Sequence, residues 1–196
     1  MTINLFDKTE KYLIASLPLL ILLGFLVPEW IQFFLQISMA NGLVALGLML
    51  QVRAGLVSFG QGLYFCVGGY AAGIAGHFWG ISDAFILLLL GLLSSLLIAI
   101  LIGFLMSQYR DIFFAMLSLA LSMILYGLLV KAGFLGSTDG FNLPKTTFLG
   151  WNPEGGDWNQ AAYIFTCIPT IVITLLLHRY LRSPMGYLNE AIRENE

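Results

Sequence analysis

The sequence has few charged residues and little cysteine. Only 10% of its 196 residues are Asp, Glu, Lys or Arg, whereas an ordinary soluble domain carries roughly 25%. Nine basic residues stand against eleven acidic ones, so no basic stripe is available to neutralise phosphates. Cys66 and Cys167 both fall in apolar stretches, where a small buried side chain is expected rather than a disulfide. The composition therefore argues against a soluble domain and against a nucleic-acid partner.

The motifs that would supply energy or catalysis are also missing. The sequence has no glycine-rich phosphate loop ending in Gly-Lys-Ser or Gly-Lys-Thr, no regular series of arginines and no metal-ligand or nucleophile cluster. His77 and His178 lie near the ends of apolar stretches, where an interfacial residue is simpler than a proton relay. We expect no enzyme, no metal site and no cofactor of its own. If this chain moves a solute uphill, another chain supplies the energy.

Apolar residues make up 59% of the chain, and the mean hydropathy is +0.87. Six charge-free intervals have lengths close to the roughly 17–25 residues that one helix needs to cross a bilayer. They predict an all-α polytopic membrane protein. The expected spans are 12–27, which Pro18 would kink or loosen, 31–52, 58–77, 84–106, 112–130 and 161–177. The interval 54–82 is the longest and the richest in glycine, so a re-entrant segment there is an alternative to six full crossings.

The distribution of cations predicts the orientation. With six spans, one side holds seven cations and the other only two, which places both termini in the cytoplasm. The first group is Lys8, Lys11, Arg53, Arg110, Arg179, Arg182 and Arg193, and the second is Lys131 and Lys145. The connection 131–160 is then an extracytoplasmic loop with Trp151 and Trp158 available for the membrane interface. It is either a docking surface for an external partner or a plain cover over the helix ends.

Two further stretches have recognisable patterns. Small residues recur every four positions at Gly68, Ala72 and Gly76, with Gly69 beside them, which lets another helix approach closely. This spacing is primarily a packing signal and only secondarily a pore lining. Residues 183–196 combine an initial Ser-Pro with a glycine and an amphipathic turn. They predict a short cytoplasmic helix that lies either in a groove of a partner or free in solvent.

Several runs together resemble the permease subunits of branched-chain amino acid ABC transporters. They are Ser-Pro-Met-Gly at 183–186 followed by Ala-Ile-Arg-Glu-Asn-Glu at 191–196, the segments 55–62, 68–72 and 109–120, and the turn 136–140. The resemblance implies a bacterial inner-membrane subunit that pairs with a second permease subunit, two cytoplasmic ATP-binding subunits and an extracytoplasmic substrate-binding protein. It also implies that no ATPase site belongs to this chain, that lipid surrounds it, and that residues 183–196 couple it to the ATPase.

The resemblance also assigns residues. ATPase coupling is expected from Gly186, which would permit a turn, from Ala191, which would allow close approach, and from Ile192, Arg193, Glu194 and Asn195. Helix packing or the transport path is expected from Ser58, Gly60, Gln61, Gly62, Gly68, Gly69, Ala72 and Gly76. Docking of the binding protein is expected at Asp139 and Gly140.

Two departures from the family pattern leave alternatives open. Gln61 stands where many relatives have histidine, and the chain ends at Glu196 inside the coupling segment, where family members continue. We therefore expect either a piece of a longer permease or a natural truncation. The leading hypothesis is an importer subunit for branched-chain or other hydrophobic amino acids, with other amino acids, amides or urea as alternative substrates. The rival is a non-transporting scaffold whose helices associate through the face of Gly68, Ala72 and Gly76.

Overall fold

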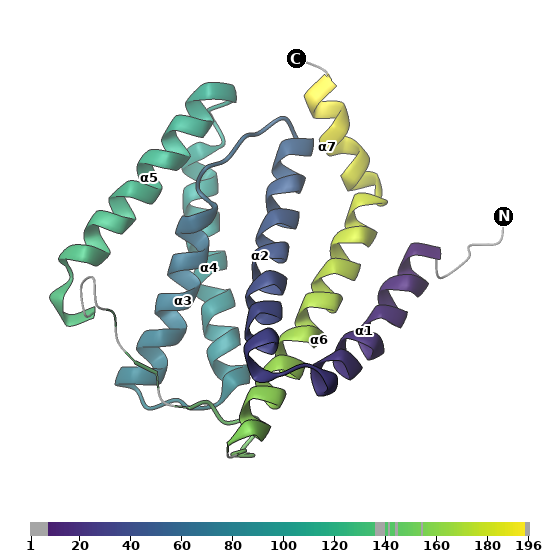
Figure 1. The fold of residues 1–196 in the computed structure, drawn as a ribbon. Helices are drawn as coiled ribbons and strands as arrows, with labels where there is room; N and C mark the ends of the chain where they lie inside the picture. The colour runs from purple at the N-terminus through teal and green to yellow at the C-terminus, as the bar shows by residue number, and fades with distance from the viewer. Residues whose placement is uncertain (1–7, 136–139, 141, 144, 154, 195–196) are drawn as a thin grey trace. The chain divides into compact units, whose positions relative to one another are not determined.

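A computed structural model describes residues 8–135, 140, 142–143, 145–153 and 155–194 (Figure 1). Within these residues the regular structure is helical, which confirms the predicted all-α class. The helices are α1 (Lys8–Leu26), α2 (Glu29–Arg53), α3 (Gln61–Phe78), α4 (Ala84–Met106), α5 (Asp111–Lys131), the 3-10 helix η1 (Gly133–Leu135), α6 (Gly156–Leu181) and α7 (Pro184–Glu194).

Five of the described helices are long and apolar enough to cross a membrane, namely α1, α2, α4, α5 and α6. Large apolar side chains of α4, among them Leu97 and Phe104, are exposed, as expected of a helix that faces lipid. Helix α3 has 18 residues, several of them glycine, and is not among these five. The chain is thus a polytopic membrane protein, while a sixth crossing and the side of the N-terminus stay predictions.

The helices match the expected spans closely, and local hydrogen bonding accounts for their ends. Helix α4 has the predicted bounds, and the Oδ1 atom of Asp83 caps it by accepting a hydrogen bond of 2.9 Å from the backbone N–H of Phe85. Helix α3 begins at Gln61 rather than at 58. Helix α6 begins at Gly156 rather than at 161, with Asp157 in the first turn, where a carboxylate interacts favourably with the helix dipole.

The chain forms two compact units. The first combines Met1–Ala54 with Pro153–Glu196 and contains α1, α2, α6 and α7. In this unit α6 packs against both α1 and α2, and α7 contacts α6 and α2. The second unit is the continuous segment Gly55–Asn152, with α3, α4 and α5, in which α3 packs against α4 and α5.

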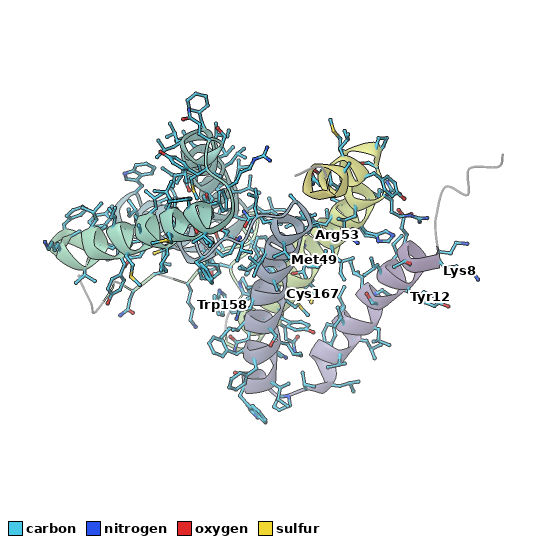
Figure 2. The ribbon with its side chains drawn as sticks, turned by 90° about the horizontal axis from the view of Figure 1, so that it is seen from above. Lys8, Tyr12, Met49, Arg53, Trp158 and Cys167 are labelled. Carbon is cyan, nitrogen blue, oxygen red and sulfur yellow. The ribbon has the colours of Figure 1, made fainter. Side chains whose placement is uncertain are left out.

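The core of the first unit centres on Tyr163 and Cys167 of α6, both fully buried. The ring of Tyr163 fills a notch at Gly24 of α1, where a Cβ atom would lie only 2.5 Å from the ring atom Cε1. The hydroxyl of Tyr163 donates a 3.0 Å hydrogen bond to the carbonyl of Leu20. The Sγ atom of Cys167, a residue labelled in Figure 2, lies 3.8 Å from the Sδ atom of Met39 on α2. Helix α6 therefore packs against α1 through Tyr163 and against α2 through Cys167.

Charged residues gather at the two ends of the first unit. At one end the Nε atom of Arg179 donates a 2.9 Å hydrogen bond to Oε1 of Glu10, a buried carboxylate at the start of α1. Helix α2 ends at Arg53, and this helix contacts α7 (Figure 1). At the other end the Nδ2 atom of Asn159 donates a 2.8 Å hydrogen bond to Oε2 of Glu29. The side of the membrane on which this end lies stays a prediction.

In the second unit α3 and α4 approach closely through glycine. A Cβ atom at Gly91 of α4 would lie 2.9 Å from the carbonyl oxygen of Gly68 on α3 and 3.8 Å from the Cβ atom of Ala72. One turn further along α4, the hydroxyl of Ser95 donates a 3.1 Å hydrogen bond to the carbonyl of Tyr64. Small residues and an interhelical hydroxyl contact are the usual means of helix association in lipid.

Candidate functional site

The first candidate site is helix α7, which lies where a short amphipathic helix was expected. Pro184 occupies its first position, where the absence of an N–H costs nothing. Ser183 joins α7 to α6, because its hydroxyl donates a 2.6 Å hydrogen bond to the carbonyl of Tyr180 while its own carbonyl accepts one of 2.9 Å from the N–H of Gly186. The Nδ2 atom of Asn189 also donates to the hydroxyl of Tyr180, at 3.1 Å. These bonds hold α7 firmly to the end of α6.

Gly186 has a different role from the expected one. It lies inside α7 and is not among the glycines with a left-handed backbone, so it does not form a turn. A Cβ atom at this position would lie 2.6 Å from the carbonyl oxygen of Tyr180 and even nearer to that of Leu181. Glycine is therefore needed here for the close approach of α7 to the last carbonyls of α6.

One side of α7 borders an apolar groove of about 550 Å³. Its lining residues are Arg182, Pro184, Tyr187, Leu188 and Ala191. The side chains of Tyr187 and Leu188 are exposed, as is that of Met185, which does not line the groove. Of the other expected coupling residues, Ile192, Arg193 and Glu194 continue the helix, and Asn195 lies outside the described residues.

The second candidate site is the non-helical segment that precedes α3. The buried hydroxyl of Ser58 accepts a 3.1 Å hydrogen bond from the N–H of Gly60. The N–H of Phe59 donates a 3.0 Å bond to the hydroxyl of Ser118 on α5, which itself donates 2.8 Å to the carbonyl of Ala115. Side-chain hydroxyls thus satisfy backbone groups that helix formation leaves without partners.

This segment and α5 enclose an open apolar cavity of about 530 Å³. The lining residues are Gly55, Val57, Phe59, Ile112, Ala115, Met116 and Leu119. Gly60 faces away from the cavity toward Ser118, since a Cβ atom there would lie 3.3 Å from the Cβ atom of that serine. Gln61 begins α3 directly after this turn. The expected path residues Ser58 and Gly60 therefore position the segment on α5 rather than line its cavity.

The expected packing stripe on α3 is in contact with other parts of the second unit. Its members are Gly68, Ala72 and Gly76. The first two face Gly91 of α4, and Gly76 lies against the side chain of Leu143 from the connection that follows η1. Gly62 and Gly69 have open space where a Cβ atom would lie. The stripe is thus used for packing within the chain, while Gly62 and Gly69 face outward.

The expected docking residues lie in the connection between α5 and α6. Asp139 falls outside the described residues, and Gly140 has a left-handed backbone with φ of 69°. After Gly140 the connection contacts α3, because the backbone carbonyl of Asn142 lies 3.2 Å from Nδ1 of His77 at the end of that helix. The docking role of both residues stays a prediction.

Several structural contacts had no signal in the sequence that could identify them. The pair of Glu10 and Arg179 joins residues that are 169 positions apart, and Tyr163 and Ser118 stand among apolar neighbours without any motif. In the described part of the chain, no group of three His, Cys, Asp or Glu side chains could hold a metal ion.

The fold and these sites define a class of protein, a polytopic helical membrane protein with a short amphipathic helix attached to the end of the apolar helix α6. Residues 30–196 match the family model described as the permease component of branched-chain amino acid transport systems, and the chain belongs to this family. The family and the five apolar helices identify a multi-pass integral protein of the inner membrane.

Two curated relatives support this assignment. The chain is 25% identical over 213 residues to the high-affinity branched-chain amino acid transport system permease protein LivM of Escherichia coli strain K12. It is 24% identical over 212 residues to the protein of the same name from Salmonella typhimurium strain LT2. Each alignment covers 96% of this chain and 50% of the relative, so the chain spans about half the length of these relatives. No solved structure matches the chain.

Proposed function

We propose that this chain is a permease subunit of an ATP-driven importer of branched-chain amino acids. The subunit contributes helices to the path and takes its energy from ATP hydrolysis on partner proteins. Family membership supports the class of transporter. The sequence supports the separate energy source, because it has no phosphate-binding loop of its own. On this proposal the chain is a transporter component rather than an enzyme and needs no cofactor.

The observation that carries the proposal is the attachment of α7 to α6. Tyr180 and Ser183 fix α7 to the end of an apolar span, while Tyr187 and Leu188 leave an apolar surface open beside it. A partner that moves α7 therefore also pulls on α6. An amphipathic helix with exposed apolar anchors is suited to a groove on another protein. We assign this role to α7 and its groove, with a cytoplasmic ATP-binding subunit as the occupant.

The complete assembly we propose contains a second permease subunit, two ATP-binding subunits and an extracytoplasmic substrate-binding protein. Leucine, isoleucine and valine are the proposed substrates because the family description and the names of both relatives specify branched-chain amino acids. Uptake of these three amino acids, of urea and of a small amide into vesicles that contain the reconstituted complex tests this choice. Transport of urea or the amide alone would refute it.

The coupling role is tested with a pair of charge substitutions on α7. Leu188→Asp places a carboxylate in the groove, whereas Met185→Asp adds the same charge to an exposed site outside it. Co-purification from native membranes, with and without a non-hydrolysable ATP analogue, measures binding of the ATP-binding subunit. We expect Leu188→Asp to abolish recovery of that subunit and Met185→Asp to retain it. Equal recovery with both variants would show that the groove is not the coupling surface.

The scaffold hypothesis makes a different prediction. It requires a free face of Gly68, Ala72 and Gly76, yet this face already packs within the second unit. The packing argues against scaffold association through these residues. Substrate flux above background in reconstituted vesicles would exclude a scaffold without transport, and stable co-purification with membrane partners in the absence of any flux would favour it.

A further inference from the structure

The connection between α5 and α6 contains a tight hairpin with an unusual residue at its tip. The backbone N–H groups of Phe148 and Trp151 each donate a 2.9 Å hydrogen bond to the carbonyl of the other residue. Between them Leu149 has φ of 50° and Gly150 has φ of 81°. Two-residue turns with positive φ at both positions strongly favour Asn, Asp or Gly at the first one. Among the described residues, Leu149 is the one non-glycine residue with positive φ.

The strained leucine is also exposed. Its residue surface is 78% accessible, so packing inside the unit does not compensate for the backbone strain. Trp151, at the other end of the turn, is exposed as well. The hairpin therefore presents two large apolar side chains outward from the second unit, and the described residues of this unit do not bury them.

Hydrogen bonds fix the base of the hairpin at the start of α4. The N–H of Thr147 donates a 2.7 Å bond to the carbonyl of Ser82, and the N–H of Ala84 donates a 2.8 Å bond to the carbonyl of Thr147. Ala84 is the first residue of α4, whose 23 residues form the most apolar of the five candidate spans. The base of the hairpin thus lies at the level where this span begins.

The depth of the tip follows from this attachment. A helix of 23 residues is about 35 Å long at 1.5 Å per residue, against a hydrocarbon core of about 30 Å, so each end of α4 reaches only slightly beyond the core. Leu149 is two residues from Thr147 and can lie at most about 7 Å from it. The interfacial layer is itself about 5–7 Å thick on each side. The base of the hairpin therefore lies in the interfacial layer, and its tip lies in this layer or at its outer edge.

Other side chains at this end of the second unit have the same character. At the end of α3, Trp79 is 70% accessible and Phe78 is also exposed. Helix α3 and the connection are joined there, through His77 and Asn142. Tryptophan is enriched at membrane interfaces because its ring is apolar and its N–H can reach water or headgroups. Trp79 and Trp151 are therefore suited to the same layer as the base of the hairpin.

We propose that the hairpin 148–151 is a membrane-binding element that inserts Leu149 and Trp151 between phospholipids at the polar–apolar boundary of the leaflet on its side. The ligand is the glycerol and upper acyl region of the lipid. The proposal requires that α4 crosses the bilayer, and it is independent of the transport function and of the orientation of the chain. A water-soluble protein partner would instead bind the tip from the aqueous side, where water-soluble reagents would also reach it.

Depth-dependent fluorescence quenching tests the proposal. The reporter is Leu149→Trp in the full chain, with the four native tryptophans replaced by Phe. The protein is reconstituted in phosphatidylcholine vesicles whose acyl chains are brominated either near the headgroup or near the terminal methyl. We expect strong quenching by the shallow bromines, weak quenching by the deep ones, and little quenching by aqueous iodide. Phe104→Trp, exposed on the opposite end of α4, is the lipid-facing control in the same background.

A second variant covers the case in which the tryptophan-free background does not fold. Leu149→Cys, with Cys66 and Cys167 changed to Ala, reacts with a membrane-impermeant maleimide. We expect labelling in vesicles to be about tenfold slower than in the SDS-denatured protein, as for a side chain transferred out of water. Emission typical of tryptophan in water, efficient iodide quenching or full maleimide reactivity would overturn the proposal. Those outcomes would assign the tip to the aqueous phase, where a soluble partner could bind it.

Discussion

The role of Gly186 predicts how a single methyl group affects the junction between α6 and α7. In Gly186→Ala the new carbon would lie 2.6 Å from the carbonyl oxygen of Tyr180 and nearer still to that of Leu181. Ordinary contacts begin at 3.4 Å, so α7 must move by at least about 0.8 Å to relieve the contact with Tyr180, and further to relieve that with Leu181. Both oxygens belong to the backbone, and no rotation of a side chain can relieve the contact.

The size of the effect comes from two opposing terms. Alanine is ordinarily favoured over glycine in a helix by about 1 kcal/mol, whereas overpacking costs about 1–3 kcal/mol. The net result is a loss of up to about 2 kcal/mol in the docking of α7, which is a factor of roughly 30 in its population. Hydrogen–deuterium exchange of the α7 amides in detergent measures this population, because the exchange rate follows the fraction that is open. We expect exchange to accelerate by up to about 30-fold.

Gly127→Ala in α5 is the matched control. A Cβ atom at Gly127 would meet no heavy atom within 4 Å, so this substitution should leave the exchange of α7 unchanged and stabilise its own helix by about 1 kcal/mol. Slower exchange of α7 in Gly186→Ala would refute the reasoning. It would mean that α6 and α7 can separate without cost, and the proposed transmission of force through their junction would lose its basis.

Three further predictions concern the packing of the two units, and SDS titration of the detergent-solubilised protein measures each of them. Tyr163→Ala should lower the free energy of unfolding by about 3–5 kcal/mol because it empties the fully buried notch. Tyr163→Phe should lose only the hydrogen bond of the hydroxyl, about 1 kcal/mol. Equal losses in the two variants would contradict the claim that the ring fills a buried notch. Ser118→Ala should cost about 1–3 kcal/mol by leaving the N–H of Phe59 without its acceptor, while Ser122→Ala, which removes only a bond to its own helix, should be nearly neutral. Gly91→Ala should cost about 1–3 kcal/mol through contact with α3, and Gly103→Ala, with open space around it, should not destabilise; similar midpoints for this pair would exclude close packing at Gly91.

Much of the helical architecture is predictable from the sequence, because charges interrupt the apolar intervals at nearly every helix end. Helix α4 matches its expected bounds of 84–106 because Asp83 both ends the charge-free interval and caps the helix. The start of α3 is not predictable in this way. Residues 58–60 are as apolar as the helix that follows, and their conformation depends on Ser118, which is distant in the sequence. A local pattern contains no information about such a partner.

The first candidate site, helix α7, was also predictable in part. Its position and helical form follow from the amphipathic pattern of residues 183–196, and the structure has α7 there. The prediction that Gly186 permits a turn was wrong. Glycine in a sequence suggests a turn, whereas the structure requires glycine here for the close contact with two carbonyls of α6. The strained tip at Leu149 was missed entirely. A leucine between Phe148 and Gly150 has no local signal for a left-handed backbone.

The division of the chain into two units has a consequence for biogenesis. The second unit is continuous, so its helices can assemble as soon as they are synthesised. The first unit joins the beginning of the chain to its end, and Glu10 precedes its partner Arg179 by 169 residues. At about 5–20 residues per second, a ribosome needs roughly 8–34 s to cover that distance. Helices α1 and α2 must therefore remain in the membrane without α6 during this time, so the first unit can be completed only after the second unit has been synthesised.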